Sequence, residues 1–141
     1  MLSNNKETSS NVRLIVEQFN HAALVVLDVS ASMGWYKDWL GFDSLGWGQN
    51  ARPHYANNGI TKLALLQARD SERFTFTVNQ EVRACHIAFR TNRGGFNEYG
   101  RRLSEVGIEY EKLTPSDPQS LNFGDPDGHL IEVVTYELES G

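Results

Sequence analysis

The sequence predicts an α+β fold of two paired β-α-β-β-β modules with curved, mostly antiparallel sheets. Three observations lead to this prediction. A strand with the pattern His-x-Ala occurs twice, at His21 and at His86. Each of these strands leads into a helical pattern that ends at a glycine, Gly41 or Gly107, and further strand patterns follow each helix. The two histidines are 65 positions apart and the two glycines 66, the near-constant offset expected of an internal duplication.

The first helix is predicted by the spacing of its apolar residues. Met33, Tyr36 and Leu40 lie at positions i, i+3 and i+7, which share one face of a helix. Ser30 or Ser32 is expected to cap the amino end, because a serine hydroxyl accepts a hydrogen bond from a free backbone N–H there. The glycine that follows Leu40 is expected to end the helix, since glycine adopts left-handed dihedral angles at little cost.

Two strands complete the first module, over residues 60–67 (ITKLALLQ) and 73–78 (RFTFTV). Both contain β-branched or aromatic residues, the types that favour a pleated sheet. The segment 46–59 contains Trp47, Pro53 and several asparagines, a composition typical of either an irregular strand or a loop.

The second module repeats this plan. Its helix is predicted by Phe96, Tyr99, Leu103 and Val106, whose spacing again places them on one face. An Asp-Pro-Asp-Gly turn joins its last two strands, because proline and glycine suit the second and fourth positions of a tight turn. The two strands are predicted over residues 120–123 and 130–136, and the turn over residues 125–128.

The composition is that of an ordinary globular protein, with 141 residues, 40% hydrophobic and 22% charged. A formal net charge of −5 disfavours binding to nucleic acid or to an anionic membrane. We expect a disordered tail over residues 1–11 and one domain over 12–141, with modules at about 18–79 and 84–137. The tail lacks the apolar stretch of a signal peptide, and the chain has a single cysteine, so a cytoplasmic location is expected.

Three side chains in separate strands form a candidate metal site. His21 and His86 hold matching positions in the two modules, so a pseudo-twofold axis would let them face each other. Glu132, in the last strand, completes the set if its side chain points inward. Two histidines and one carboxylate bind Fe(II), Mn(II) or similar ions and leave positions open to a substrate. Taken singly, each histidine could also be a hydrogen-bonded core residue, and the glutamate could face solvent. The matching positions of the two histidines favour the metal site.

Longer motifs resemble a known superfamily. FNHAALVVLDVSASMGWYKDWLGF, at residues 19–42, resembles the opening signature of the glyoxalase/bleomycin-resistance/extradiol-dioxygenase (vicinal oxygen chelate) superfamily. CHIAFRT, at 85–91, resembles the start of its second module, and NFGDPDGHLIEVVTYE, at 122–137, resembles its end. The resemblance implies a metal cavity between curved sheets, with the three ligands already identified. It also implies a homodimer whose metal sites are shared between the subunits.

Single positions distinguish subgroups of this superfamily. Glyoxalase I has a fourth ligand, a glutamate, where alignment places Ala64, and an alanine side chain cannot bind a metal. The fosfomycin-resistance thiol transferases contact a phosphonate through a lysine and a serine, which Lys112 and Ser116 match by their spacing from the turn. The same enzymes carry a threonine and a tyrosine where this chain has Ala23 and Asn122.

The resemblance and the three-ligand set favour a metalloenzyme that chelates a small oxygenated substrate on one divalent ion per site, Fe, Mn, Ni or Zn. Extradiol-dioxygenase-like or lyase/isomerase chemistry is the first interpretation. A fosfomycin-type thiol transferase, or a non-catalytic protein that binds a small ligand or drug, is the alternative. The residues expected to contact the substrate are Trp47, His54, Arg90, Lys112 and Ser116.

Overall fold

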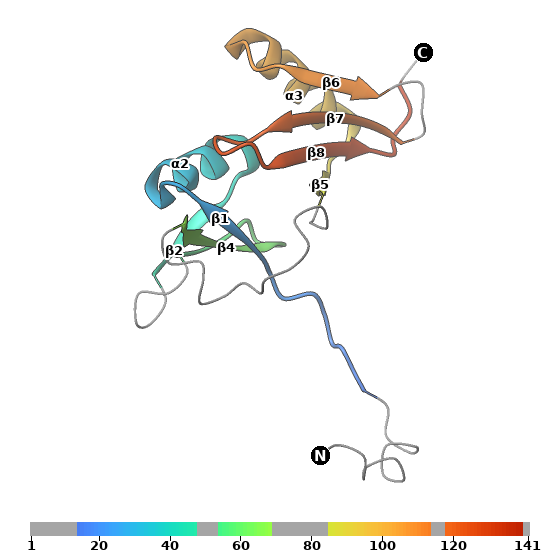
Figure 1. Cartoon of the computed structure of the whole chain (residues 1–141). Helices are drawn as coiled ribbons and strands as arrows, with labels where there is room; N and C mark the ends of the chain where they lie inside the picture. The colour runs from blue at the N-terminus through green and yellow to red at the C-terminus, as the bar shows by residue number, and fades with distance from the viewer. Residues whose placement is uncertain (1–13, 48–53, 69–84, 114–117, 140–141) are drawn as a thin grey trace.

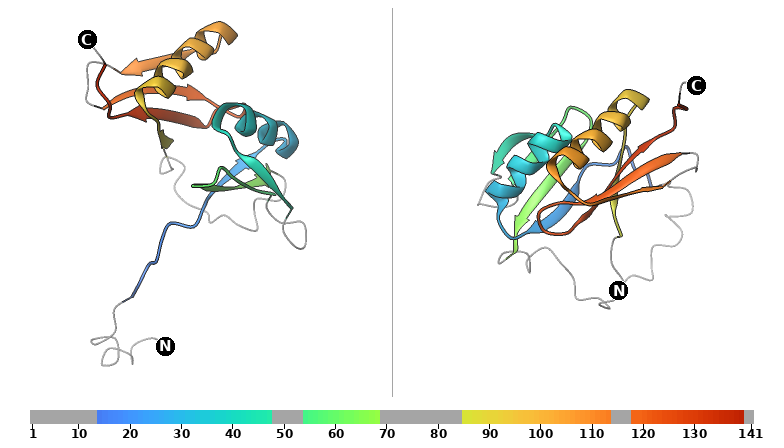
Figure 2. Two further views of the ribbon diagram at one scale, coloured as in Figure 1. Left: turned by 180° about the vertical axis from the view of Figure 1, so that it is seen from behind. Right: turned by 90° about the horizontal axis from the view of Figure 1, so that it is seen from above.

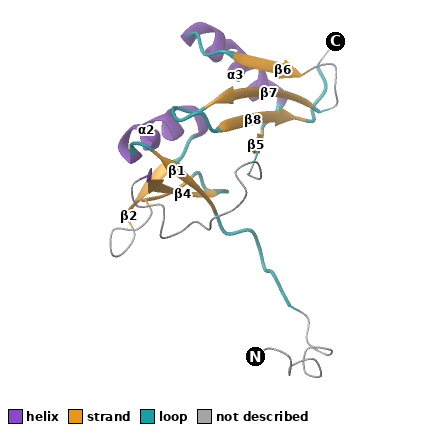
Figure 3. Cartoon of the chain, in the orientation of Figure 1, coloured by secondary structure: helices purple, strands orange, loops and turns teal. Residues whose placement is uncertain are grey.

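The segments that the computed structural model describes are residues 14–47, 54–68, 85–113 and 118–139. Within them the chain forms two helices and two four-stranded sheets, one helix and one sheet for each predicted module (Figure 1, Figure 3). This arrangement confirms the predicted α+β fold. The polar tail, the strand expected over residues 73–78 and the candidate Ser116 lie outside the described residues.

The two sheets have the same topology. Their strands are β1 (Ala22–Val26), β2 (Asp43–Trp47), β3 (His54–Asn57), β4 (Lys62–Gln67), β5 (Ile87–Arg90), β6 (Tyr110–Leu113), β7 (Gln119–Gly124) and β8 (Leu130–Thr135). The first sheet has the order β1-β4-β3-β2 and the second the order β5-β8-β7-β6. In each, the first pair is parallel and the other two pairs are antiparallel. The strands that follow the two histidines therefore occupy equivalent edges, as a duplication requires.

The first helix, α2 (Val29–Leu40), begins at an acidic cap. The carboxylate of Asp28 accepts a hydrogen bond from the backbone N–H of Ala31 at 3.1 Å. The expected cap at Ser30 or Ser32 is therefore wrong, since the residue before the first helical turn is the aspartate. A carboxylate at this place also interacts favourably with the positive end of the helix dipole.

The second helix, α3 (Arg93–Val106), is capped by Asn92, whose side chain accepts a hydrogen bond from the N–H of Gly95 at 2.7 Å. Both helices end as predicted, at Gly41 with φ 72° and at Gly107 with φ 86°. These left-handed angles favour glycine. Neither helix in the described segments is long and apolar enough to cross a membrane.

One hydrophobic core joins the two modules. The helices lie next to each other against the sheets (Figure 2), and the hydroxyl of Tyr99 in α3 donates a hydrogen bond to the carbonyl oxygen of Trp39 in α2 at 2.5 Å. Because removal of apolar surface from water drives folding, a core shared in this way holds the modules together. Its buried members are Tyr36, Trp39, Leu40, Phe42, Ala56, Leu63, Phe96, Leu103, Leu121, Phe123, Ile131 and Val133.

The two faces of the second sheet differ in the side chains that they carry. In β8, Ile131 and Val133 are buried among the core residues, whereas Glu132 between them is half-buried and points away from the core. Alternation of side chains along a strand produces these two faces. We refer to the face of each sheet opposite the helices as its open face.

Three strands were not predicted from the sequence as such. β3 and the last two residues of β2 fall within the segment 46–59, for which both an irregular strand and a loop were considered. β6 has the sequence YEKL and is exposed along its whole length, at the edge of the second sheet. An exposed edge strand needs no alternation of apolar and polar residues, so the usual strand signal is absent.

Candidate metal centre

His86 and Glu132 lie beside each other on the open face of the second sheet. His86 immediately precedes β5, and Glu132 lies in the neighbouring parallel strand β8, in register with Ala88. The Nε2 atom of His86 is 3.3 Å from Oε1 of Glu132. Their side chains are 41% and 22% exposed, so an ion can reach both from solvent.

This geometry suits two ligands of one metal ion. Divalent transition metals bind imidazole nitrogen and carboxylate oxygen at roughly 2.0–2.2 Å. Two such ligand atoms at octahedral or tetrahedral angles lie about 2.8–3.6 Å apart, as follows from those bond lengths. The 3.3 Å separation falls within this range. A nitrogen and oxygen donor set is also one that Mn, Fe and Zn accept.

His21 lies on the other sheet, immediately before β1. Its Nδ1 donates a hydrogen bond to Oδ1 of Asn20 at 2.6 Å. In a histidine held in this way the proton is on Nδ1, so Nε2 keeps a lone pair that can bind a metal. Within the described residues, no group of three His, Cys, Asp or Glu side chains is placed to hold one ion. A single chain thus brings His86 and Glu132 together and leaves His21 apart.

Tyr55 is a neighbour of His21 that the sequence did not reveal. The two rings meet edge to face, with centroids 5.8 Å apart, and the Nζ atom of Lys62 lies 5.8 Å from the Tyr55 centroid. Tyr55 pairs with Ala64, which is fully buried and pairs in turn with Ala23. The segment around Tyr55 shows no periodicity in the sequence, so its face was not predictable. Ala64, the fourth-ligand position, contributes only a methyl group beside these strands.

Arg90 lies on the same face as the metal ligands. It is in β5, two residues beyond Ala88, and pairs in register with Val134. Its guanidinium carbon is 4.5 Å from the ring centroid of Tyr136, which supports the side chain by a cation–π contact. A positive charge is therefore present on the open face, where an anionic part of a substrate would meet it.

Lys112 lies on the opposite side of the same sheet. It pairs with Leu121, a core residue, and its Nζ atom is 5.9 Å from the ring centroid of Phe96 in α3. Cross-strand partners point to the same face, so Lys112 is directed toward the helices and away from Glu132. Within one chain, the structure does not bring Lys112 to the candidate metal site.

His54 is also turned toward the helices. It is buried, pairs with the core residue Leu65 in β4, and its Nε2 lies 2.7 Å from Oγ of Ser44. Burial lowers the pKa of the His54 imidazole, because the charged form is poorly solvated there. The backbone of Trp47 pairs with His54 at the end of β2. His54 and His21 therefore lie on different faces of the first sheet.

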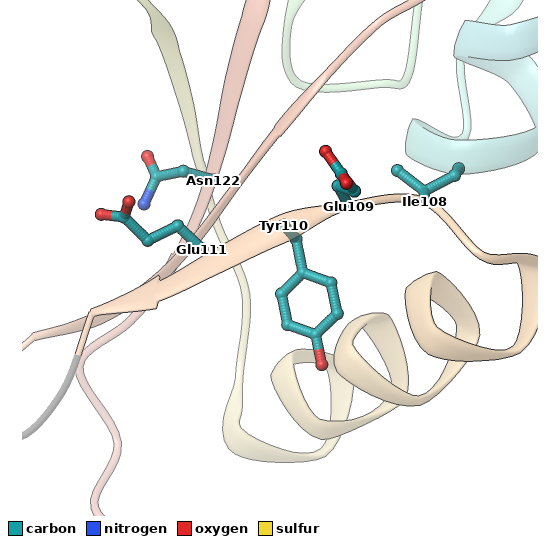
Figure 4. A pocket seen from close by; sticks show the side chains of 5 residues that line it. All are labelled: Ile108, Glu109, Tyr110, Glu111 and Asn122. Carbon is teal, nitrogen blue, oxygen red and sulfur yellow. The ribbon is translucent and has the colours of Figure 1, made fainter.

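An open depression lies at the edge strand β6 of the second sheet. Its volume is about 610 Å³, and Glu111 and Asn122 line it on the open side, whereas Tyr110 points toward α3 (Figure 4). The strand register places Glu111, Asn122, Glu132 and Ala88 in one row across the four strands. Asn122 therefore lies between the depression and Glu132.

Comparisons with known proteins agree with this architecture. A family model described as Glyoxalase/Bleomycin resistance protein/Dioxygenase superfamily matches residues 18–133. The chain is 32% identical over 127 residues to Metallothiol transferase FosB of Staphylococcus epidermidis, covering 88% of this chain and 85% of FosB. It is 28% identical over 120 residues to Glutathione transferase FosA of Serratia marcescens, covering 84% of this chain and 81% of FosA.

The fold is also that of a solved structure. The fosfomycin resistance protein FosX of Listeria monocytogenes superposes with a TM-score of 0.66 at 18% identity, covering 85% of this chain and 91% of FosX. At this identity the likeness establishes the fold alone.

Proposed function

The chain belongs to the Glyoxalase/Bleomycin resistance protein/Dioxygenase superfamily, and from this premise we propose that it is a metal-dependent thiol transferase acting on a small oxygenated substrate. The observation that carries the proposal is the 3.3 Å approach of His86 Nε2 to Glu132 Oε1 on an accessible face. The reaction class is supported by two relatives named as a metallothiol transferase and a glutathione transferase. Dioxygenase-like or lyase chemistry, the first interpretation of the sequence, takes second place because these relatives do not support it.

A homodimer would complete the ligand set. His21 of the partner subunit would join His86 and Glu132, since the chain's own His21 lies on a different sheet. The single chain leaves large apolar side chains in water, which supports their burial against a second copy. Residues 14–20 run away from the sheets (Figure 1). In this segment and the first module, the six most exposed large apolar side chains are Leu14, Ile15, Val16, Phe19, Leu27 and Ile60.

The residues of the second sheet have distinct roles in this proposal. When bound, a divalent metal acts as a Lewis acid that stabilises negative charge on a substrate oxygen. His86 and Glu132 hold the ion, and the small side chain of Ala88, in the same row as Glu132, leaves space beside it. Arg90 orients an anionic group of the substrate. The thiol sulfur forms a bond to an electrophilic carbon, the carbon–oxygen bond breaks, and the thiol proton ends on the released oxygen.

The proposal names the substrate only as a small oxygenated electrophile and does not specify a phosphonate. Lys112 is directed to the opposite side of the sheet from Glu132. Ala23 and Asn122 replace the threonine and tyrosine of the fosfomycin-type pattern. The residues on the open face suit a small electrophile that has a metal-binding oxygen. Asn122 can form a hydrogen bond with a further polar group of that substrate.

The test combines metal content with adduct formation. The full chain, purified without a metal-chelating tag, is loaded with Mn²⁺ or Zn²⁺ and incubated with glutathione or cysteine and a panel of small epoxides. Mass spectrometry should detect a thiol adduct for the wild type and none for Glu132→Gln. Glu98→Gln is the matched control, because Glu98 is an exposed carboxylate of α3 that pairs with Arg101 and lies away from the open face.

Two outcomes contradict the proposal. A metal-loaded protein that forms no adduct but consumes O₂ with a catechol would restore the dioxygenase interpretation. A protein that binds none of these metals would leave a small-ligand binding protein.

A further inference from the structure

The turn before β8 is attached to the strand that follows His21. The Nε2 of His129 donates a hydrogen bond to the carbonyl oxygen of Val25, in β1, at 2.8 Å. The backbone N–H of Leu27, just after β1, donates to Oδ1 of Asp127 at 3.3 Å. Two contacts thus reach the end of β1 from a turn about a hundred positions later in the chain.

Asp125 gives this turn a defined shape. Its Oδ1 accepts hydrogen bonds from the backbone N–H groups of Asp127, at 2.9 Å, and of His129, at 2.8 Å. Its Oδ2 accepts a hydrogen bond from the hydroxyl of Tyr36, in α2, at 2.6 Å. Both Asp125 and Tyr36 are buried, so water does not compete for these bonds. Burial raises the pKa of the Tyr36 phenol well above its usual range, which keeps its proton available as a donor.

The turn lies between two candidate metal ligands of one chain. Glu132 follows His129 by three residues, and His21 precedes Val25 by four. Paired residues of β1 connect His21 to Val25, and paired residues of β8 connect His129 to Glu132. A displacement of the turn would therefore change the orientation of His21 relative to Glu132.

We propose that His129 is a positioning residue, which holds β1 and therefore His21 in a fixed orientation relative to β8 and Glu132. This inference rests on the metal site of the proposed function. In a dimer with shared sites, His21 and Glu132 of one chain serve different sites. The contact between His129 and Val25 then links the two metal sites of the dimer, and its loss weakens metal binding although every ligand is still present.

The experiment is a Mn²⁺ titration of the full chain by calorimetry, well below the unfolding temperature. His129→Leu removes the donor, and we expect a loss of affinity of about tenfold, the lower end of what removal of an orienting contact costs at metal sites. His129→Gln restores an N–H donor and should recover most of the affinity. Ser32→Ala is the control, since Ser32 Oγ donates to the other oxygen of Asp127, at 3.4 Å, and within the described residues it has no hydrogen bond to β1.

Circular dichroism at the titration temperature shows whether each variant is folded. If His129→Leu does not fold, Asp127→Ala, which removes the contact to Leu27, is titrated instead with the same expected weakening. A lower melting temperature with unchanged Mn²⁺ affinity would show that the contact is only structural and would overturn the inference. If the wild type binds Mn²⁺ and His21→Ala weakens it but His129→Leu does not, the positioning role fails and the proposed function stands. A wild type that binds no Mn²⁺ overturns both.

Discussion

Glu132 and His86 face each other across the parallel pair β5 and β8, with Oε1 and Nε2 3.3 Å apart. Glu132 lies within the paired strand β8, and His86 directly precedes Ile87, the first paired residue of β5, so the sheet brings the two side chains together without a metal ion. Such preorganisation removes part of the ordering cost of metal binding. The prediction that these residues hold a divalent ion follows from this relationship.

Replacement of either residue should remove the metal without unfolding the chain. His86→Ala and Glu132→Ala each delete a partly exposed side chain on the open face, so we expect unfolding free energies within about 1 kcal/mol of the wild type. Elemental analysis should show loss of the metal in both variants and its retention in Glu98→Gln. Two unfolded variants would instead assign the pair a structural role.

The stability of the apo-protein should fall in mild acid because of His54. Burial holds the pKa of His54 below its ordinary value of about 6.5, so the unfolded chain takes up the proton more readily than the folded chain. The His54 contribution is therefore complete above about pH 6.5 and is lost as the pH falls through the lowered pKa of the folded state. Urea unfolding at a series of pH values should show a shallower acid decline for His54→Asn. Parallel curves for the two proteins would contradict this.

Tyr36→Phe should destabilise the protein more than Tyr99→Phe. Both changes keep the ring and remove one hydroxyl donor. Tyr36 donates to the carboxylate of Asp125, whereas Tyr99 donates to the neutral carbonyl of Trp39. Bonds to charged groups contribute about 1.5–3 kcal/mol and neutral ones about 0.5–1.5 kcal/mol. Chemical denaturation measures both variants, and equal losses would mean that the Asp125 bond has no special role.

Arg90 and Lys112 should differ in their effect on an anionic substrate. Arg90→Gln should raise the KM for such a substrate, because the guanidinium lies on the open face. Lys112→Gln should leave the KM unchanged, because its ammonium group lies beside Phe96 on the helix side. Steady-state kinetics with a carboxylated and an uncharged epoxide separate the two effects. An increase in KM for Lys112→Gln would show that the lysine reaches the substrate in the assembled protein.

Much of the fold is encoded in local signals of this sequence. The repeated His-x-Ala strands, the apolar spacing of the helices and the terminal glycines at Gly41 and Gly107 each depend on a few neighbouring residues. These predictions are confirmed because tertiary contacts reinforce the local preferences. The place of Glu132 on the open face of β8 also follows directly from alternation.

The rest depends on contacts between distant segments. Lys112 was matched by spacing alone, but its face is set by the register of β6 against β7, where one residue of shift reverses every side chain. The contact of His129 with Val25 joins positions 104 residues apart, and no local pattern indicates it. Tyr55 lies in a segment with no periodicity. In each case the missing information is which strands pair, and in which register.

The most direct test of the account is a subunit-mixing measurement of bound metal. His21→Ala and Glu132→Ala, each without metal, are mixed under conditions that exchange subunits. If the site is shared between chains, each heterodimer contains one intact site and one site with both defects. With random exchange the metal content should rise to about a quarter of the wild-type value, because half of the dimers are mixed. A mixture that stays as empty as its separate components would contradict a shared site formed by His86, Glu132 and His21 of the partner subunit.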